Sequence, residues 1–206
     1  MKDDNHILQQ ENQAFSPDKV WFTSDSHFFH SNVIEYSHRP FSGVNEMNEE
    51  MIRRWNSVVH RDHTVFHLGD FCLGTPEQWN YILDRLKGKI ILIVGNHDSR
   101  QMSEDLIRRF ELVTPQLRIR VGHQKIYLNH FPFLCFSGEN YGDWQLFGHI
   151  HTNPYAHNVI DERRLSLLLP NQYDVGVDNN DFTPVSFRRL QEIIKAEPVV
   201  KEKPTD

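Results

Sequence analysis

The segment KIILIVGNHD, residues 89–98, places the strongest constraint on the fold of this chain. Its apolar residues are nearly continuous, whereas a strand with one face in water alternates apolar and polar residues. We therefore expect a buried strand with other layers packed on both of its faces. The apolar run stops at Asn96, His97 and Asp98, so polar side chains gather where this strand ends.

Two earlier apolar runs end in the same way. Residues 19–25 predict a strand that ends at Asp25, and residues 63–70 predict a strand that ends at Asp70. The segments between these strands are predicted to be helices. The reason is either that their apolar residues recur at helical spacing or that a Ser or Thr stands before the first turn. These segments are residues 44–59, 75–86 and 103–110.

The second half of the chain is richer in strands. Residues 117–130 alternate around Gly122 and predict a pair of strands, and the last predicted helix runs from about 186 to 196. Further short strands are expected at residues 144–151, 164–169 and 173–178. This order predicts an α/β fold, a layered β-sandwich of two mixed sheets flanked by helices. In such folds ligands bind beyond the carboxyl ends of the strands.

The chain has 206 residues, and no linker-like or low-complexity stretch divides it. We expect a single domain over residues 17–196, with a polar tail at 1–16 and a flexible tail at 197–206. No run of about 18 apolar residues and no export signal is present, so we predict a cytoplasmic protein that does not enter a membrane. Its 2 cysteines, Cys72 and Cys135, are expected to stay reduced.

The net charge and the histidine content limit which substrates and metal ions the chain is expected to bind. The formal net charge is −6 and no dense Lys/Arg run occurs, which argues against binding long nucleic acid through many phosphate contacts. Small or short substrates fit better, and the sequence is silent on oligomeric state. The chain contains 13 His and only 2 Cys. Imidazole combined with carboxylate suits Zn, Mn, Fe or Ni, whereas structural zinc sites are rich in thiolate.

Metal-competent residues follow five of the predicted strands. Each group alone has an ordinary explanation as a turn or a cap. Five such groups in order, each after an apolar strand, are difficult to explain as turns and predict one shared site. The groups are Asp25 with His27, Asp70, Asn96 with His97 and Asp98, His130, and His149 with His151.

This ordered set of motifs resembles the calcineurin-like metallophosphoesterase superfamily. The resemblance rests on Asp-x-His, Gly-Asp, Gly-Asn-His-Asp, a single His and Gly-His-x-His, and it spans residues 25–151. It implies a β-sandwich flanked by helices with the site at the strand ends, in agreement with the fold predicted above. A His-x-x-His-x-Asn pattern followed by Arg-Pro-Phe is similar to a small single-domain bacterial and phage-like branch of the superfamily.

The resemblance also implies the ligands of two divalent ions. One ion would be held by Asp25, His27, Asp70 and His151, and the other by Asp70, Asn96, His130 and His149. Asp70 would bridge the two, because cations about 3.5 to 4 Å apart repel unless anionic groups lie between them. Mn, Fe, Ni, Zn and Co all suit such ligands, and we favour Mn.

The same resemblance places His97 near the leaving group and off the metals, as a general acid or charge stabiliser. Asp98 would orient its imidazole and favour the cationic form. The alternative is that His97 only packs and that Asp98 caps a turn.

We expect the segment between Asp25 and Asp70 to recognise the substrate. His30, Asn32 and Arg39 closely follow the first candidate ligands, and an Arg can hold a phosphate through two hydrogen bonds. Aromatic residues in the same segment suit stacking on a base. The alternative is an ordinary loop whose aromatics fill the core and whose Arg39 pairs with a surface carboxylate.

Together these features predict a two-metal phosphodiesterase that acts on small or nucleotide-like phosphate esters with a metal-bridging hydroxide. Phosphomonoesterase and short-oligonucleotide nuclease are the alternatives within the same chemistry. A noncatalytic metal-binding scaffold with this fold is the alternative from another class, and the presence of His97 argues against it.

Overall fold

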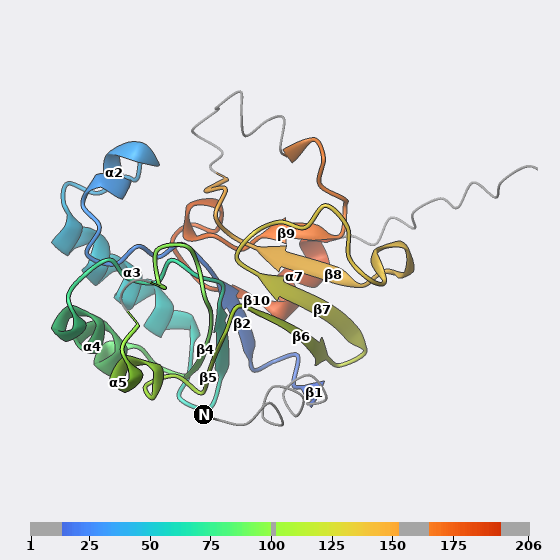
Figure 1. Cartoon of the computed structure of the whole chain (residues 1–206), viewed down its shortest axis with the longest axis horizontal. Coiled ribbons are helices and arrows are strands. Elements are labelled where there is room, and N and C mark those ends of the chain that lie inside the picture. Colours follow the sequence, from blue (N-terminus) through green and yellow to red (C-terminus); the bar gives the residue numbers. More distant parts are fainter. Residues whose placement is uncertain (1–13, 100–101, 153–164, 195–206) are drawn as a thin grey trace, which may run out of the picture.

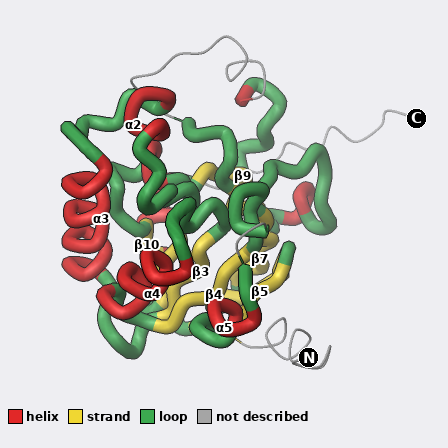
Figure 2. Tube along the Cα trace, turned by 60° about the vertical axis from the view of Figure 1, so that its left-hand side comes forward, coloured by secondary structure: helices red, strands yellow, loops and turns green. Residues whose placement is uncertain are grey.

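The computed structural model describes residues 14–99, 102–152 and 165–194. Two five-stranded sheets pack against each other, one in the order β10-β2-β3-β4-β5 and the other in the order β1-β6-β7-β8-β9. Figure 1 shows helices α3, α4 and α5 on the outer side of the first sheet, and Figure 2 shows the same helices from another side. The predicted α/β sandwich of two mixed sheets with flanking helices is confirmed.

Four strands of the first sheet run parallel, and β10 (Val185–Ser186) pairs antiparallel with β2 at one edge. The parallel strands are β2 (Val20–Thr23), β3 (Thr64–His67), β4 (Lys89–Ile93) and β5 (Leu112–Thr114). The helices that connect them are α3 (Val44–Val58), α4 (Pro76–Arg85) and α5 (Glu104–Ile107). Because each helix returns the chain to the same end of the sheet, the carboxyl ends of the parallel strands share one edge.

Strand β4 is buried on both faces, as its continuous apolar sequence predicts. Ile91 and Ile93 lie in the core between the two sheets, whereas Ile90 and Leu92 lie in the core between the first sheet and the helices. Both faces of the strand from Ile90 to Ile93 therefore exclude water, and polar residues lie at its two ends.

Helix α4 begins where the Thr-Pro pair predicts a start. The Thr75 hydroxyl accepts a hydrogen bond from the Gln78 N–H (3.4 Å), and the Gln78 carboxamide oxygen accepts one from the Thr75 N–H (2.8 Å). Pro76 occupies the first turn, where a missing N–H costs little. This reciprocal cap fixes the loop that leads from β3 into the helix.

The second sheet is built around the β6–β7 hairpin, which turns at Gly122 with a φ of 58°. β8 runs parallel to β7, β9 runs parallel to β8, and β1 runs parallel to β6. Helix α7 (Phe187–Ile193) adds Phe187 and Leu190 to the core between the sheets. The strands are β1 (Ala14–Phe15), β6 (Gln116–Val121), β7 (Gln124–Asn129), β8 (Trp144–Phe147) and β9 (Gln172–Asp174).

The structure differs from the sequence predictions in several bounds. The strand expected at 164–169 is wrong in its described part, because residues 165–169 contain no strand and the Leu168 N–H instead donates to the Leu165 carbonyl oxygen (3.1 Å). Arg164 lies outside the described residues. Residues 14 and 15, predicted as tail, form β1, because the Phe15 ring packs edge-on against Phe66 at 5.1 Å.

Some helical segments also differ. The helix expected at 103–110 ends at Ile107, and a short helix, α2 (Asn32–Tyr36), lies in the segment after Asp25. Two 3-10 turns, η1 (Glu139–Tyr141) and η2 (Val177–Asn179), were not predicted. Helix α7 ends at Ile193, and the predicted tails at 1–13 and 197–206 lie outside the described residues. No helix in the described ranges is long and apolar enough to cross a membrane.

Candidate metal centre

The carboxyl ends of β2, β3, β4, β7 and β8 are each followed by candidate ligands. Ser24, after β2, forms a parallel bridge with Gly176, after β9, which joins the two sheets at this edge. Five candidate ligands have a positive φ, a conformation that is uncommon outside glycine and concentrates at functional sites. They are Asp25 (55°), His27 (49°), Asp70 (55°), His149 (70°) and His151 (52°).

Asp25, His27 and His151 form the first group of side chains that can hold a metal ion. His27 Nε2 lies 3.1 Å from His151 Nε2, which in turn lies 3.7 Å from Asp25 Oδ1. Asp25 Oδ1 is buried without a hydrogen-bond partner, which is costly unless a cation meets it. Burial, reinforced by the nearby His151, holds the pKa of His27 well below its usual value, so its lone pair is free for a metal.

Asp70, His130 and His149 form the second group. His130 Nε2 lies 3.5 Å from Asp70 Oδ2 and 2.9 Å from Asn96 Oδ1. Its other ring nitrogen, Nδ1, donates to the Leu68 carbonyl oxygen at 2.7 Å, so Nε2 is the atom directed at the group. Asn96 therefore adds a neutral oxygen beside this second group.

Asp70 lies between the two groups. Its Oδ2 is 3.6 Å from His27 Nε2 in the first group and 3.5 Å from His130 Nε2 in the second. Its Oδ1 accepts a hydrogen bond from the His97 N–H (2.9 Å), which orients the carboxylate. The structure thus brings all seven predicted ligands together, and their carboxylate, amide and imidazole atoms fit divalent transition-metal ions.

Arg39 was predicted to contact the substrate, but the structure places it in a buried ion pair. Its side chain is fully buried, and the guanidinium donates from Nε and Nη2 to the two carboxylate oxygens of Asp178 (2.8 and 2.9 Å). It also donates to the carbonyl oxygens of Asp25 (2.7 Å) and Ser26 (3.0 Å). Arg39 therefore holds the loop that carries the first ligands, and it is not exposed to a substrate.

Asp178, which sequence reasoning missed as a site residue, links Arg39 to the metal centre. Its Oδ2 lies 2.8 Å from His151 Nδ1, on the opposite side of the ring from the nitrogen that faces Asp25. Arg39, followed by His151, keeps the pKa of this carboxyl low despite burial, which alone would raise it. A carboxylate bonded to the far nitrogen orients a histidine ligand and raises its basicity.

Asp98 also differs from its predicted role. Its Oδ2 accepts hydrogen bonds from the N–H groups of Asp70 and Gly95 (2.8 Å each), and its Oδ1 accepts one from the Phe71 N–H (2.9 Å). Burial raises its pKa to about 6. The side chain ties together the loops after β3 and β4, as the turn-capping alternative holds. These three bonds go to backbone N–H groups and not to the imidazole of His97.

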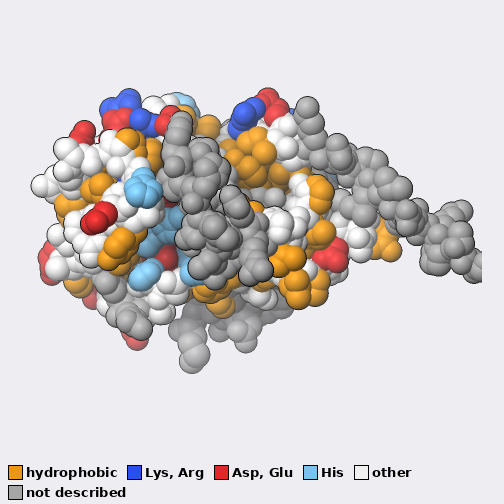
Figure 3. Space-filling view, turned by 90° about the horizontal axis from the view of Figure 1, so that it is seen from above, with side chains coloured by type: hydrophobic (Ala, Val, Ile, Leu, Met, Phe, Trp, Pro, Cys, Tyr) orange, Lys and Arg blue, Asp and Glu red, His pale blue; other side chains and the backbone are white. Residues whose placement is uncertain are grey.

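The other predicted site residues lie toward solvent. The His97 side chain is 46% exposed and its Nε2 lies 4.0 Å from Asp70 Oδ2, beside the centre. His30 Nδ1 lies 3.2 Å from His27 Nδ1, so His30 also borders the centre, whereas Asn32 is exposed on α2. Figure 3 shows histidine side chains (pale blue) gathered on this face of the molecule. Of the predicted substrate-side residues, His30 and His97 therefore lie nearest to the two candidate metal-binding groups.

Two glycines allow the loops to approach the ligands closely. A Cβ added at Gly148 would overlap Ser24 Oγ and Asp25 Oδ2, and one added at Gly95 would overlap Asp70. Asp25 Oδ2 instead accepts a hydrogen bond from the His149 N–H at 2.9 Å. The Gly-His and Gly-Asn motifs are thus required by space as well as by the ligands that follow them.

The fold and the paired Asp–His groups define the class of this protein as a metal-dependent phosphoesterase. The profile of the calcineurin-like phosphoesterase superfamily domain matches residues 19–170, and the chain belongs to this family. It is therefore an enzyme that hydrolyses phosphate esters.

The chain also resembles individual proteins over most of its length. It is 32% identical over 186 residues to the uncharacterized protein MJ1445 of Methanocaldococcus jannaschii, covering 89% of this chain and 95% of that protein. It is 31% identical over 188 residues to the Gene 66 protein of Mycobacterium phage L5, covering 77% of this chain and 86% of that protein. The crystal structure of AQ665 from Aquifex aeolicus, a protein of unknown function, shares the fold with a TM-score of 0.63 at 23% identity, covering 84% of this chain and 97% of that one.

Proposed function

We propose that the chain is a phosphodiesterase that uses two divalent metal ions, preferably Mn, on small or nucleotide-like phosphate esters. The observation that carries the proposal is the position of Asp70, whose Oδ2 lies within 3.6 Å of an imidazole nitrogen from each of the two groups. Two ions held in this way would activate water and offset the charge of the phosphoryl oxygens.

The chain itself supplies a proton donor for the leaving oxygen. His97 is half-exposed at the edge of the centre, and its backbone N–H holds Asp70 while its ring stays free of the two ligand groups. His30 lies next to it, with 6.3 Å between the ring centroids. Histidine is suited to this transfer because its ordinary pKa lies near neutral pH.

The charge of the site supports a diester over a monoester. A phosphate monoester carries close to two negative charges at neutral pH and a diester carries one, so a monoesterase gains more from additional cations. Arg39 cannot serve, because its guanidinium is buried against Asp178. Within the described part of the chain, His30 and His97 are the basic side chains seen to border the two groups.

The proposal is tested by comparing kcat/KM for bis-p-nitrophenyl phosphate and p-nitrophenyl phosphate with Mn, Fe, Ni, Zn or Co. We expect the diester to be the better substrate. Faster turnover of the monoester would favour the phosphomonoesterase alternative, and no turnover of either ester with any metal would favour the noncatalytic scaffold.

The role of His97 is tested with a diester that has an alkoxide leaving group, such as a dinucleotide, because an alkoxide needs a proton donor more than p-nitrophenolate does. His97→Ala should keep its metals and lose about 100-fold or more in kcat. His123→Ala, an exposed histidine in the β6–β7 turn, is the matched control and should behave as wild type. Unchanged turnover in His97→Ala would remove this residue from the mechanism.

A further inference from the structure

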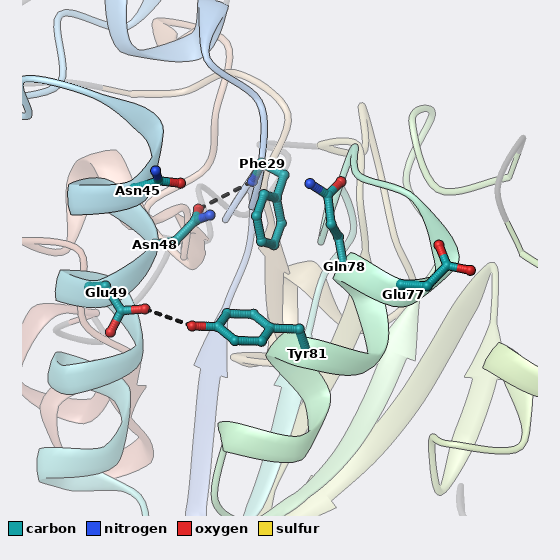
Figure 4. A pocket seen from close by; sticks show the side chains of 7 residues that line it. All are labelled: Phe29, Asn45, Asn48, Glu49, Glu77, Gln78 and Tyr81. Carbon is teal, nitrogen blue, oxygen red and sulfur yellow. Dashed lines mark hydrogen bonds between the residues drawn. The ribbon is translucent and has the colours of Figure 1, made fainter.

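A pocket of about 380 Å³ lies between the amino-terminal halves of α3 and α4. Figure 4 shows Phe29 and Tyr81 pointing into the space between the two helices, with the amides of Asn48 and Gln78 directed toward Phe29 from either side. The volume is in the range of small-ligand sites. The residues that line the pocket are distinct from those of the two candidate metal-binding groups.

The pocket is connected to the metal centre through the turn at residues 27–30. The His30 N–H donates to the His27 carbonyl oxygen at 3.0 Å, and Phe29 within this turn has a φ of 62°. The imidazoles of His27 and His30 meet on the side of the metals, whereas the ring of Phe29 lines the pocket. Consecutive residues are about 3.8 Å apart, so the pocket begins beside the histidines that border the metals.

Two amide nitrogens of the pocket, those of Asn48 and Gln78, are available as hydrogen-bond donors. Asn48 is 2% exposed; its Oδ1 accepts from the Phe29 N–H (3.2 Å), but its buried Nδ2 has no partner. The Gln78 oxygen is occupied by the Thr75 N–H, which leaves its Nε2 to point toward Phe29. A buried donor without an acceptor is destabilising, so an acceptor that a bound group brings to Asn48 Nδ2 would stabilise it.

The pocket has two aromatic lining residues, Phe29 and Tyr81, and their contacts hold them in place. The rings of Phe29 and Tyr81 lie 6.2 Å apart, and the Tyr81 hydroxyl donates to Glu49 (3.0 Å), which is itself paired with Arg85 (2.7 Å). The Arg85 hydrogen bond lowers the pKa of Glu49 to about 2, so the pair stays ionised. Rigid aromatic walls favour a flat ring over a flexible chain.

The charge of the pocket excludes a phosphate as its occupant. Its lining holds the carboxylates of Glu49 and Glu77 and, among the described residues, no Lys or Arg. The amide oxygen of Asn45 can accept a bond from an amino group. A planar ring with both acceptor and amino groups matches this set, and nucleobases are such rings.

We propose that this base pocket binds the nucleobase of a nucleotide ester whose phosphate lies at the metal centre. The proposal rests on the proposed phosphodiesterase function and specifies its substrate class. Asn48 Nδ2 and Gln78 Nε2 donate to ring nitrogens or carbonyl oxygens of the base, and the Asn45 amide oxygen accepts from its amino group. Phe29 and Tyr81 contact its faces and edge.

The test compares two diesters that release the same p-nitrophenolate. One is the p-nitrophenyl ester of adenosine 5′-monophosphate, whose base has both ring acceptors and an amino group, and the other is methyl p-nitrophenyl phosphate, which has no base. We expect the Mn-loaded wild type to prefer the nucleoside ester by about 10-fold or more in kcat/KM, as stacking on aromatic side chains allows. Tyr81→Ala and Gln78→Glu should bring this ratio toward unity, whereas Tyr81→Phe, which keeps the ring, should retain the preference.

The outcomes separate the base pocket from the proposed function. A wild-type ratio near unity, or the wild-type ratio in Tyr81→Ala, overturns the base pocket while phosphodiesterase activity stands. If neither ester is hydrolysed, the proposed function fails. Calorimetric titration of the metal-free protein with the four common nucleosides then decides whether the pocket binds a base. Saturable binding that weakens in Gln78→Glu supports the pocket, and no saturable binding overturns it.

Discussion

Replacing Arg39 with Met tests whether this residue positions the metal ligands or binds substrate. Met has a similar length and no charge, so it removes the bonds to Asp178 and to the carbonyl oxygens of Asp25 and Ser26. Removing one partner of a buried ion pair costs about 3–5 kcal/mol, because the other charge is left buried. Since a domain is stable by only about 5–15 kcal/mol, the variant should unfold at much lower denaturant.

The assay is guanidinium denaturation of the metal-free protein, followed by circular dichroism. Asp178→Asn in the same chain should restore part of the loss, because it removes the buried Asp178 charge, which without Arg39 keeps only its bond to His151. Arg53→Met, which removes an exposed pair with Glu50, is the control and should change stability little. The metal affinity of Arg39→Met should fall by about 10- to 100-fold, through the lost support of His151.

The alternative role predicts the opposite pattern. If Arg39 binds the substrate phosphate, its replacement raises KM and leaves the free energy of unfolding nearly unchanged. A destabilisation below about 1 kcal/mol together with a raised KM would therefore refute the positioning role.

Three further predictions follow from local geometry. Gly148→Ala should lose metal, because the new Cβ displaces Asp25. Gly43→Ala, where the new Cβ has no atom within 4 Å, is the control and should retain metal. Metal content is measured by mass spectrometry of the purified proteins, and equal content in both would contradict the packing argument. Asp98→Asn should lower the free energy of unfolding by about 1–3 kcal/mol, because the carboxamide offers one acceptor oxygen to the three N–H groups that the carboxylate binds through two. A loss of activity with unchanged stability would instead support the role of Asp98 in orienting His97. Cys135 is exposed and should react quickly with Ellman's reagent in the native protein, whereas burial raises the pKa of Cys72 to about 12 and should protect it. Both thiols should react in denaturant. Two fast thiols in the native state would show that the core around Cys72 opens.

The positions of the candidate ligands could be predicted because the signal is local. Asp25, Asp70 and Asn96 each follow an apolar strand within a few residues, and the connecting helices bring those strands to one edge. A strand buried on both faces, such as β4, leaves its two ends as the places for polar side chains. The fold class and the site location therefore follow from the same periodic pattern.

The role of Arg39 could not be predicted because its partner is remote in sequence. Asp178 lies 139 residues away, and no local pattern around it distinguishes a site residue from a turn residue. The bridge between Ser24 and Gly176, a contact between residues far apart in sequence, brings the end of β9 beside the loop after β2. An Arg near candidate ligands is equally consistent with binding a phosphate and with closing a buried ion pair.

Asp98 shows a different limit. Its position next to His97 suggests a pair, but adjacent side chains in a loop need not point the same way. Three N–H groups from the loops after β3 and β4 compete for its carboxylate and occupy both oxygens. Backbone donors cannot be counted from side-chain identities, so the turn-capping role emerges only from the folded loops.

The bridging position of Asp70 is the central claim, and Mn titration followed by electron paramagnetic resonance tests it most directly. A carboxylate shared between two ions about 3.5 to 4 Å apart predicts two Mn per chain with exchange coupling between them. Asp70→Asn should lose the coupled signal and nearly all hydrolysis, while His97→Ala should keep the signal. One Mn per chain at saturation, or two uncoupled ions in the wild type, would contradict the account.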